Sequence, residues 1–372
     1  MKPAGVLLMS RALHAGGTER QLTKTAVALD RSKFTPHVGC FRVHGDDAFY
    51  RSELEAAGVP VVEFPVQSLF SPWSILAGGS AIRRYIRHHG IRIVHTFDVP
   101  ANIFGVPAAR FARTDLVLSS QRAHRGLLAA RGTLMLRITD RLANGIVVNC
   151  RAIETHLIQH YGVPREKIHL CYNGIDASAF QPEPRQYMDM LRGADVVIGV
   201  VCVLRPEKNL PVLVEAFARM KTHAPGAKLA IVGDGSMRAA LEAQACSLGV
   251  GADCVFAGRA HNVADWLRSI DIFVLPSTSE ALSNSLMEAM ACGCAPVASD
   301  VGGNPELVEH GVNGLLFPPA NVDELAKCLG DLAVNREMRR RFADASERIV
   351  KGRFSLDAAA RRMGDIYASL LR

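Results

Sequence analysis

Short apolar runs alternate with longer amphipathic stretches along the chain. Runs of four to eight apolar residues between turn residues are typical of buried parallel strands, and apolar residues three or four positions apart indicate helices. Such alternation predicts doubly wound α/β domains. The strands fall into two series, which we place at 5–9, 37–42, 61–64, 91–95, 116–120, 145–149 and 168–171, and then at 196–203, 228–232, 254–256, 272–275, 295–298 and 314–317.

A polar segment, 176–193, separates the two series and contains Pro182 and Pro184. We therefore predict a first domain over 1–185 and a second over 186–355. A final helical pattern over 356–372 follows the second series, and we expect it to pack back on the first domain. With 372 residues, each domain is large enough to bury its own core.

Composition changes this picture little. The chain is 49% hydrophobic and 21% charged, which is ordinary for a globular protein. No apolar run reaches the roughly 20 residues that span a bilayer, and the first apolar run is too short for the core of a signal peptide. We expect a cytoplasmic protein.

Charge is divided unevenly. Residues 1–185 hold 23 Lys and Arg against 14 Asp and Glu (+9), and residues 186–372 hold 20 against 22 (−2). Such a basic first half can meet an anionic membrane or a phosphorylated acceptor, although solvated helix faces give the same pattern. No aromatic stacking platform accompanies the charge, so we expect no nucleic-acid partner. The densest basic stretches are 83–89 and the series Arg122, Arg125, Arg131, Arg137 and Arg141, which is interleaved with apolar residues that include Leu127 and Leu128.

Two glutamates flank a predicted helix start in the second half. The buried strand 272–275 leads through a polar turn to a helix that begins near Ser283, Asn284 or Ser285. Open α/β sheets bind ligands at this edge, and the first amides of a helix stabilise phosphate. Glu280 lies just before this helix and Glu288 about one turn inside it.

Carboxylates in these positions can accept hydrogen bonds from hydroxyl-rich groups on both sides of a bound diphosphate, and sugars and riboses are such groups. The alternative is structural. Ser285 and Glu288 have the spacing of a capping box, and Glu280 can be a solvated loop charge.

Each half also opens with a candidate phosphate element. After the first strand, Gly16 and Gly17 allow close backbone approach before a helix that can start at Thr18. After the first strand of the second half, Arg205 and Lys208 stand beside a helix start, where two cations suit a diphosphate. A plain turn and solvated loop charges are the alternatives.

Ordered motifs over nearly the whole chain resemble the retaining glycosyltransferases of family four, which have the GT-B architecture. The Gly-Gly-Thr-Glu-Arg loop that begins at Gly16 is one of them. The others are Asn173-Gly-Ile-Asp, Arg205-Pro-Glu-Lys-Asn, Val232-Gly-Asp-Gly, Pro276-Ser-Thr-Ser-Glu-Ala-Leu-Ser-Asn-Ser-Leu-Met-Glu-Ala-Met-Ala-Cys-Gly and Val301-Gly-Gly-Asn-Pro-Glu.

The resemblance implies two Rossmann-like domains that face each other across a cleft, with a nucleotide-sugar donor held mainly by the second. Glu288 would bind the ribose and Glu280 the sugar hydroxyls. Lys208 would bind phosphate, and Arg259 would lie near the base or the diphosphate. The diphosphate would also meet the amides of Leu282, Ser283, Asn284 and Ser285. The family usually has an arginine where this chain has Val203, and Arg205 is the nearest substitute.

The resemblance also implies a retaining transfer that needs no protein nucleophile, because a phosphate oxygen of the donor can take the acceptor proton. The family often places a histidine after the strand that corresponds to 116–120, where Arg122 or His124 can take that place. Asp98, at the end of the strand 91–95, can contact acceptor or donor hydroxyls or serve only the structure. The catalytic candidates are Glu280, Lys208, Arg205, His124 and Arg122. The chain has no Asp-x-Asp, so we expect neither a metal nor another cofactor.

We therefore expect an enzyme that moves a sugar to a saccharide or lipid-linked acceptor in the synthesis of cell-surface polysaccharide or glycolipid. A UDP-sugar of gluco configuration is the expected donor, with GDP-mannose next. The basic first domain can place the enzyme on the inner face of the membrane. The alternatives are a nucleotide-sugar epimerase of the same architecture and a non-catalytic nucleotide-sugar sensor.

Overall fold

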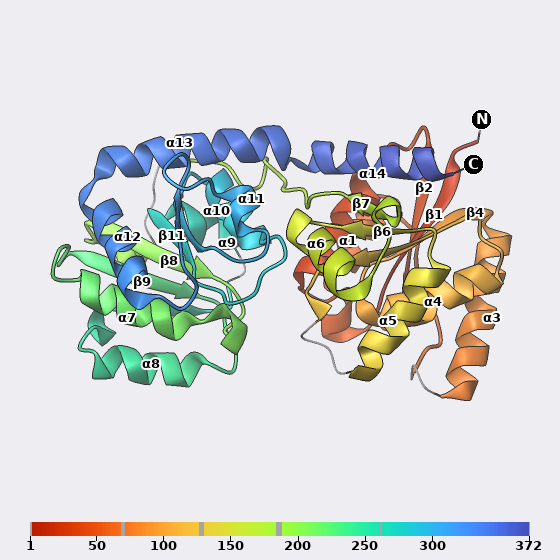
Figure 1. Cartoon of the computed structure of the whole chain (residues 1–372), viewed down its shortest axis with the longest axis horizontal. Helices are drawn as coiled ribbons and strands as arrows, with labels where there is room; N and C mark the ends of the chain where they lie inside the picture. Colours follow the sequence, from red (N-terminus) through yellow and green to blue (C-terminus); the bar gives the residue numbers. More distant parts are fainter. Residues whose placement is uncertain (1, 68–70, 126–129, 184–187, 261, 372) are drawn as a thin grey trace. The chain divides into compact units, whose positions relative to one another are not determined.

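The chain forms two compact units in the computed structural model, which describes residues 2–67, 71–125, 130–183, 188–260 and 262–371 (Figure 1). The first unit comprises 1–174 and 356–372, and the second comprises 175–355. The two units divide between Gly174 and Ile175. The sequence predicts the boundary further along the chain, after residue 185 in the polar segment.

The first unit is built on a parallel sheet of seven strands in the order β3-β2-β1-β4-β5-β6-β7. Its strands are β1 (Ala4–Ser10), β2 (Phe34–Cys40), β3 (Val61–Glu63), β4 (Ile91–Thr96), β5 (Leu116–Gln121), β6 (Gly145–Val148) and β7 (Ile168–Leu170). Its α-helices are α1 (Gly17–Ala28), α2 (Arg51–Ala56), α3 (Pro72–His88), α4 (Val99–Phe111), α5 (Ala130–Leu142), α6 (Arg151–Tyr161) and α14 (Leu356–Leu370).

Helices cover both faces of this sheet, because successive side chains of a strand point to opposite faces. Leu7 and Met9 of β1 belong to a core that includes side chains of α3 and α4. Val6 and Leu8 belong to the opposite core, which includes side chains of α1 and of the final helix α14. A strand buried on both faces reads as a continuous apolar run, which is why the sequence marks it clearly.

The final helix is also joined to the sheet by a buried polar chain. The Tyr367 hydroxyl lies 2.8 Å from Nδ1 of His95, and Nε2 of the same imidazole lies 2.9 Å from the Ser120 hydroxyl. Burial, and then the charge of Arg122, lower the pKa of His95 well below its usual value. A neutral imidazole therefore connects α14 to the ends of β4 and β5.

The second unit has a parallel sheet of six strands in the order β10-β9-β8-β11-β12-β13. The strands are β8 (Val196–Val201), β9 (Ala227–Val232), β10 (Cys254–Gly258), β11 (Ile272–Leu275), β12 (Ala295–Ser299) and β13 (Leu315–Phe317). The helices are α7 (Leu210–Met220), α8 (Arg238–Ser247), α9 (Val263–Arg268), α10 (Asn284–Ala291), α11 (Asn304–Leu307), α12 (Val322–Val334) and α13 (Arg336–Arg353).

The predicted fold class is confirmed: both units are doubly wound α/β structures, and every predicted strand is present. The strand ends differ from the prediction by three residues at most, as at β2, which begins at Phe34 rather than at His37. Among the described residues, no helix is long and apolar enough to cross a membrane.

Candidate functional site

The strand order of the second sheet reverses between β8 and β11, which are adjacent but are separated in the chain by β9 and β10. In open α/β sheets the loops that leave the carboxyl ends of such a pair diverge, and the space between them is the usual ligand site. The loop after β8 carries Arg205 and Lys208, and the loop after β11 carries Glu280. The topology thus brings the loop that carries Arg205 and Lys208 next to the loop that carries Glu280.

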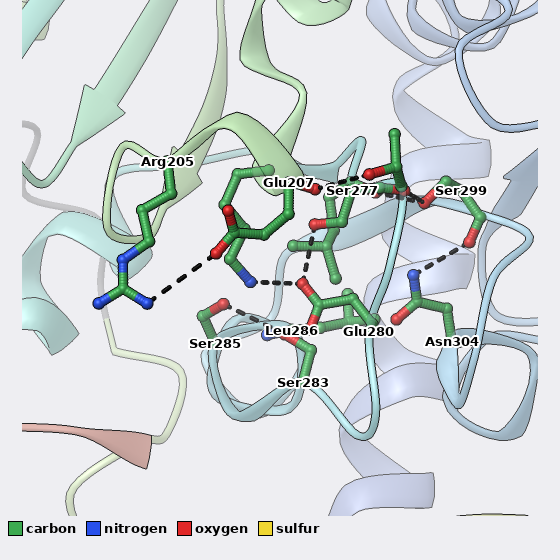
Figure 2. Close-up of polar contacts among 12 residues, drawn as sticks. Arg205, Glu207, Ser277, Glu280, Ser283, Ser285, Leu286, Ser299 and Asn304 are labelled. Carbon is green, nitrogen blue, oxygen red and sulfur yellow. Dashed lines mark hydrogen bonds and ion pairs between the residues drawn. The ribbon is translucent and has the colours of Figure 1, made fainter. Parts of the chain in front are cut away.

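Lys208 and Glu280 form an ion pair at this point, with 2.5 Å between Nζ and Oε1. The Ser277 hydroxyl donates a second hydrogen bond, of 2.8 Å, to the same Glu280 oxygen (Figure 2). The Glu280 side chain is 10% exposed and the Lys208 side chain 22%. Both partners are largely withdrawn from water, so their attraction is screened less than that of a surface pair.

Backbone contacts hold the two loops against each other. A short 3₁₀ helix, Pro206–Lys208, ends at Asn209, which has a left-handed conformation (φ 51°) and turns the chain into α7. The Glu207 carbonyl accepts a 2.9 Å hydrogen bond from the Thr278 amide. On the other side, the Ser299 hydroxyl donates to the Ser277 carbonyl at 2.6 Å. These two hydrogen bonds join the ends of β8, β11 and β12 around the ion pair.

Arg205 is not part of this pair. Its side chain is 62% exposed, and its nearest carboxylate is that of Glu207, at 3.9 Å. Figure 2 shows the guanidinium directed away from Glu280. Val203 is 48% exposed and contributes no charge. Lys208 is therefore the cation that meets Glu280.

Helix α10 begins at Asn284, within the range predicted from the sequence. Ser283 is the N-cap, and its hydroxyl accepts a 3.3 Å hydrogen bond from the Leu286 amide. Ser285 lies inside the helix, so the proposed capping box of Ser285 and Glu288 is wrong as an explanation of the helix start. Glu280, with a side chain that is 10% exposed, is not a solvated loop charge either, and Glu288 is 2% exposed.

Leu282 and Ser283 are also buried beside this helix start. The amides predicted to meet a diphosphate, those of Leu282, Ser283, Asn284 and Ser285, are thus grouped at the positive end of the α10 dipole. Arg259 is exposed and follows the end of β10, the edge strand, which β9 and β8 separate from β11.

In the first unit, the strand order reverses between β1 and β4. Gly16 and Gly17 follow β1 at the start of α1, with Gly16 as the N-cap. A methyl group added at Gly16 would lie 2.2 Å from a carboxylate oxygen of Glu19. Burial raises the pKa of Glu19. Glu19 belongs to the Gly-Gly-Thr-Glu-Arg motif but had no role assigned from the sequence, and its burial in the first turn of α1 places it against this loop.

Asp98 follows β4 and caps α4. One carboxylate oxygen accepts from the Ala101 amide at 2.7 Å, and the other accepts from the Arg11 amide at 2.6 Å. Burial raises the pKa of Asp98, and these hydrogen bonds oppose the rise. Asp98 thus joins the loops that follow β1 and β4, which supports its structural alternative.

Arg122 follows β5, and its guanidinium is enclosed. Nη1 donates to the Asn173 side chain at 2.7 Å, and the guanidinium lies 4.8 Å from the centre of the Phe97 ring. Burial lowers the pKa of Arg122 to about 10. Its Nε is buried without a hydrogen-bond partner in the part of the chain that the structure describes. His124 is separate, with its ring 4.8 Å from that of His156 on α6.

The interpretation of the arginine series from Arg122 to Arg141 as one basic surface is partly wrong. Arg125 is 1% exposed and forms a bidentate pair with Asp140, at 2.7 and 2.8 Å. Arg122 is enclosed as well, whereas Arg137 and Arg141 are exposed on α5. The side chain of Arg131 and the residues Leu127 and Leu128 lie outside the described part of the structure.

Gly302 is a residue of the site that sequence reasoning named only within a motif. Its φ is +54°, and a methyl group there would lie 1.8 Å from the carbonyl oxygen of Glu280. We expect Gly302→Ala to displace the Glu280 backbone and to destabilise the protein by about 1–3 kcal/mol, the usual range for backbone strain. Donor affinity should fall with it.

Gly330→Ala is the matched control for this change, because Gly330 lies in α12 with open space around it. We expect it to be neutral, or to stabilise by about 1 kcal/mol. Thermal melts of both variants, with and without nucleotide-sugar, measure the difference. Equal melts and equal donor affinity for the two would contradict the assigned backbone contact.

Two family models match the chain. Residues 15–179 match Glycosyltransferase Family 4, and residues 191–348 match Glycosyl transferases group 1. Among solved structures, HepE of Anabaena in complex with UDP superposes with a TM-score of 0.85 at 23% identity, over 98% of this chain and 100% of that one. This likeness shows the fold.

Curated relatives are similarly distant. A GDP-mannose-dependent alpha-(1-6)-phosphatidylinositol monomannoside mannosyltransferase of Mycobacterium tuberculosis is 25% identical over 342 residues, 86% of each chain. A D-inositol 3-phosphate glycosyltransferase of Streptosporangium roseum is 28% identical over 300 residues, 76% of this chain and 65% of the relative. The Vi polysaccharide biosynthesis protein VipC/TviE of Salmonella typhi is 25% identical over 219 residues, 56% of this chain and 38% of the relative. The chain thus spans less than two thirds of the last two.

Two doubly wound units with these structural neighbours define the GT-B class of fold. Within that class, the two matches together cover most of the sequence, one for each half. The chain belongs to the family 4, group 1 glycosyltransferases.

Proposed function

We propose that this protein transfers a sugar, with retention of configuration, from a nucleoside-diphosphate sugar to a saccharide or lipid-linked acceptor. The observation that carries the proposal is the Lys208–Glu280 pair beside the N-terminus of α10, at the point where the second sheet reverses its strand order. A cation, a hydroxyl-binding carboxylate and a helix dipole are the groups that a sugar diphosphate needs.

The pair also suggests how the donor is held. An ammonium group has three donors, so Lys208 can keep its bond to Glu280 and still donate to a phosphate oxygen. Glu280, fixed by Lys208 and Ser277, retains acceptor capacity for sugar hydroxyls. Negative charge that develops on the departing diphosphate is then stabilised by Lys208 and by the α10 dipole, both in place before the reaction.

A UDP-sugar is the proposed donor, and GDP-mannose is the second candidate. The structure of HepE of Anabaena with UDP-glucose supports the first, and the GDP-mannose-dependent relative of Mycobacterium tuberculosis supports the second. The test is a thermal-shift panel of nucleotide-sugars followed by transfer assays. A donor that binds only the folded protein raises its melting temperature. No shift with any nucleotide-sugar would contradict the proposal, and turnover that needs no acceptor would indicate an epimerase instead.

Glu288 is the proposed ribose ligand. We expect Glu288→Gln to weaken donor binding by about 1.5–3 kcal/mol, the value of a hydrogen bond to a charged group. Calorimetric titration with the best donor measures the loss. Unchanged donor affinity and activity would remove the ribose assignment and leave the rest of the site intact.

The transfer is proposed to need no divalent cation, because the proposed charge stabilisation comes from Lys208 and the helix dipole. We expect full activity after dialysis against EDTA and in its continued presence. Restoration of lost activity by Mg²⁺ or Mn²⁺ would show that a metal is required.

A further inference from the structure

Helix α3 carries one exposed stripe that is apolar at its beginning and cationic at its end. Trp73 is 81% exposed and Leu76 is 65% exposed. Arg83, Arg84 and Arg87 are exposed further along. Positions three or four apart share one side of a helix, so these residues form a continuous stripe. The opposite side of α3 is buried in the sheet core through Ile82 and Ile86.

Helix α5 also carries exposed apolar side chains and arginines on one side, here interleaved along the helix. Leu134 is 60% exposed and Ile138 is 44% exposed, and Arg137 and Arg141 are exposed beside them. The spacing again places all four on one side. Two helices of one unit thus combine large exposed apolar side chains with exposed arginines.

These helices belong to one layer. Helix α4 contacts both α3 and α5, so the three lie side by side on one face of the first sheet (Figure 1). Asp140 is the only acidic residue that the three helices contain, and it is buried against Arg125. Six exposed arginines therefore lie on helices with no exposed carboxylate to neutralise them: Arg83, Arg84, Arg87, Arg110, Arg137 and Arg141.

The apolar start of α3 lies toward the carboxyl edge of the first sheet. In a right-handed β-α-β crossover the helix runs antiparallel to the strands, so its first turn lies at their carboxyl edge. Trp73 and Leu76, in the first turns of α3, therefore lie toward the edge of the sheet that carries Gly16 and Asp98. Phe111, which is 82% exposed, ends α4 at the opposite edge.

We propose that the exposed side of α3 and α5 docks on an anionic lipid bilayer. Trp73 and Leu76 enter the interfacial region, where tryptophan is most favourable, and the arginines meet lipid phosphates. Charge complementarity favours an anionic bilayer, because the arginines of this surface have no carboxylates on the same helices to neutralise them. A purely polyanionic partner would leave the apolar side chains of the surface in water. Docking on the bilayer does not depend on the proposed function. Delivery of a lipid-linked acceptor to the docked edge does rest on the proposed function.

Trp73 gives the docking a direct readout. The chain has two tryptophans, and the other, Trp266, is 8% exposed in the second unit. We expect vesicles of phosphatidylcholine and phosphatidylglycerol in equal parts to bind the full chain and shift its emission to the blue, and pure phosphatidylcholine to do neither at the same concentration. Trp73→Phe should abolish the shift.

Matched variants test the two components separately. Arg83→Gln with Arg84→Gln should weaken co-sedimentation with the anionic vesicles about 25-fold, at about fivefold for each arginine. Arg336→Gln with Arg340→Gln removes the same charge from exposed positions of α13 and should change little. Trp73→Ala with Leu76→Ala should weaken binding at least about tenfold, whereas Phe111→Ala should not.

Three outcomes would overturn the docking surface: no binding to anionic vesicles, binding that the α13 variant weakens as much as the α3 variant, and retention on a heparin column without a Trp73 shift on vesicles. Transfer to a soluble acceptor is measured in parallel. If transfer persists while vesicles do not bind, the surface is wrong and the proposed function stands. If vesicles bind and no nucleotide-sugar is used, the docking surface stands and the proposed function is wrong.

Discussion

Lys208→Ala is expected to lower kcat/KM for sugar transfer by about 10²–10³-fold, the cost of removing one preorganised charge-stabilising donor. The change removes the cation that contacts Glu280 and leaves a carboxylate that is only 10% exposed, which keeps the hydrogen bond from the Ser277 hydroxyl. Both the phosphate contact and the orientation of Glu280 are then lost. Initial rates at saturating acceptor, over a range of donor concentrations, measure the effect on kcat and KM.

Arg205→Ala is the matched control for this variant. Arg205 lies on the same loop but is 62% exposed and 3.9 Å from its nearest carboxylate, so it contributes little in this arrangement. We expect it to lower kcat/KM about fivefold or less, the scale of an exposed ion pair. A loss as large as that of Lys208→Ala would show that Arg205 takes over the phosphate once the donor binds. Thermal melts of both variants exclude misfolding as the cause.

Buried parallel strands were the part of the fold that the sequence predicted best. The run Ile272–Leu275 is apolar on both faces, and β11 has the predicted bounds. The start of β2 was predicted too late because the first residues of this strand include Pro36. Proline has no backbone N–H and cannot donate a hydrogen bond to a neighbouring strand. Pro36 is nevertheless paired with Val6 of β1. Tertiary pairing there overrides what the local pattern indicates.

The sequence indicated Glu280 and Lys208 as candidates but not the contact between them. Glu280 could be placed before a helix from the sequence, yet its bond to Lys208 joins positions 72 residues apart. That contact depends on β8 and β11 being neighbours, which no local pattern encodes. Ser283, Asn284 and Ser285 are all plausible caps by residue type, and only the backbone shows that Ser283 is the one.

The arginines of 122–141 show a second limit. Their spacing among apolar residues favours a surface helix. Whether one of these arginines is buried depends on whether a carboxylate lies close enough to pair with it. Asp140 lies 15 residues from Arg125 and meets it with both oxygens. Arg137 and Arg141, on the same helix as Asp140, stay exposed. Pattern alone could not separate these arginines.

Arg125→Met is expected to destabilise the first unit by about 3–5 kcal/mol, the cost of removing one partner from a buried pair. Arg125 is 1% exposed, and its Nε also donates to the Gln121 side chain at 2.8 Å. Asp140 would be left buried without its cation. For a unit of this size, about 2–4 °C per kcal/mol predicts a melting temperature lower by roughly 10 °C. Scanning calorimetry of the full chain measures it.

Arg125→Met combined with Asp140→Leu separates the loss of the pair from the loss of packing. Replacing both charges by apolar groups removes the uncompensated carboxylate, so the double variant should regain at least about half of the lost stability. Vesicle binding of the double variant should equal that of the unchanged chain, because Arg125 does not reach the exposed surface of α5. If the double variant is less stable than the single one, the Gln121 contact and the Tyr161 ring, 5.0 Å from the guanidinium, carry the stability instead of the charge pair.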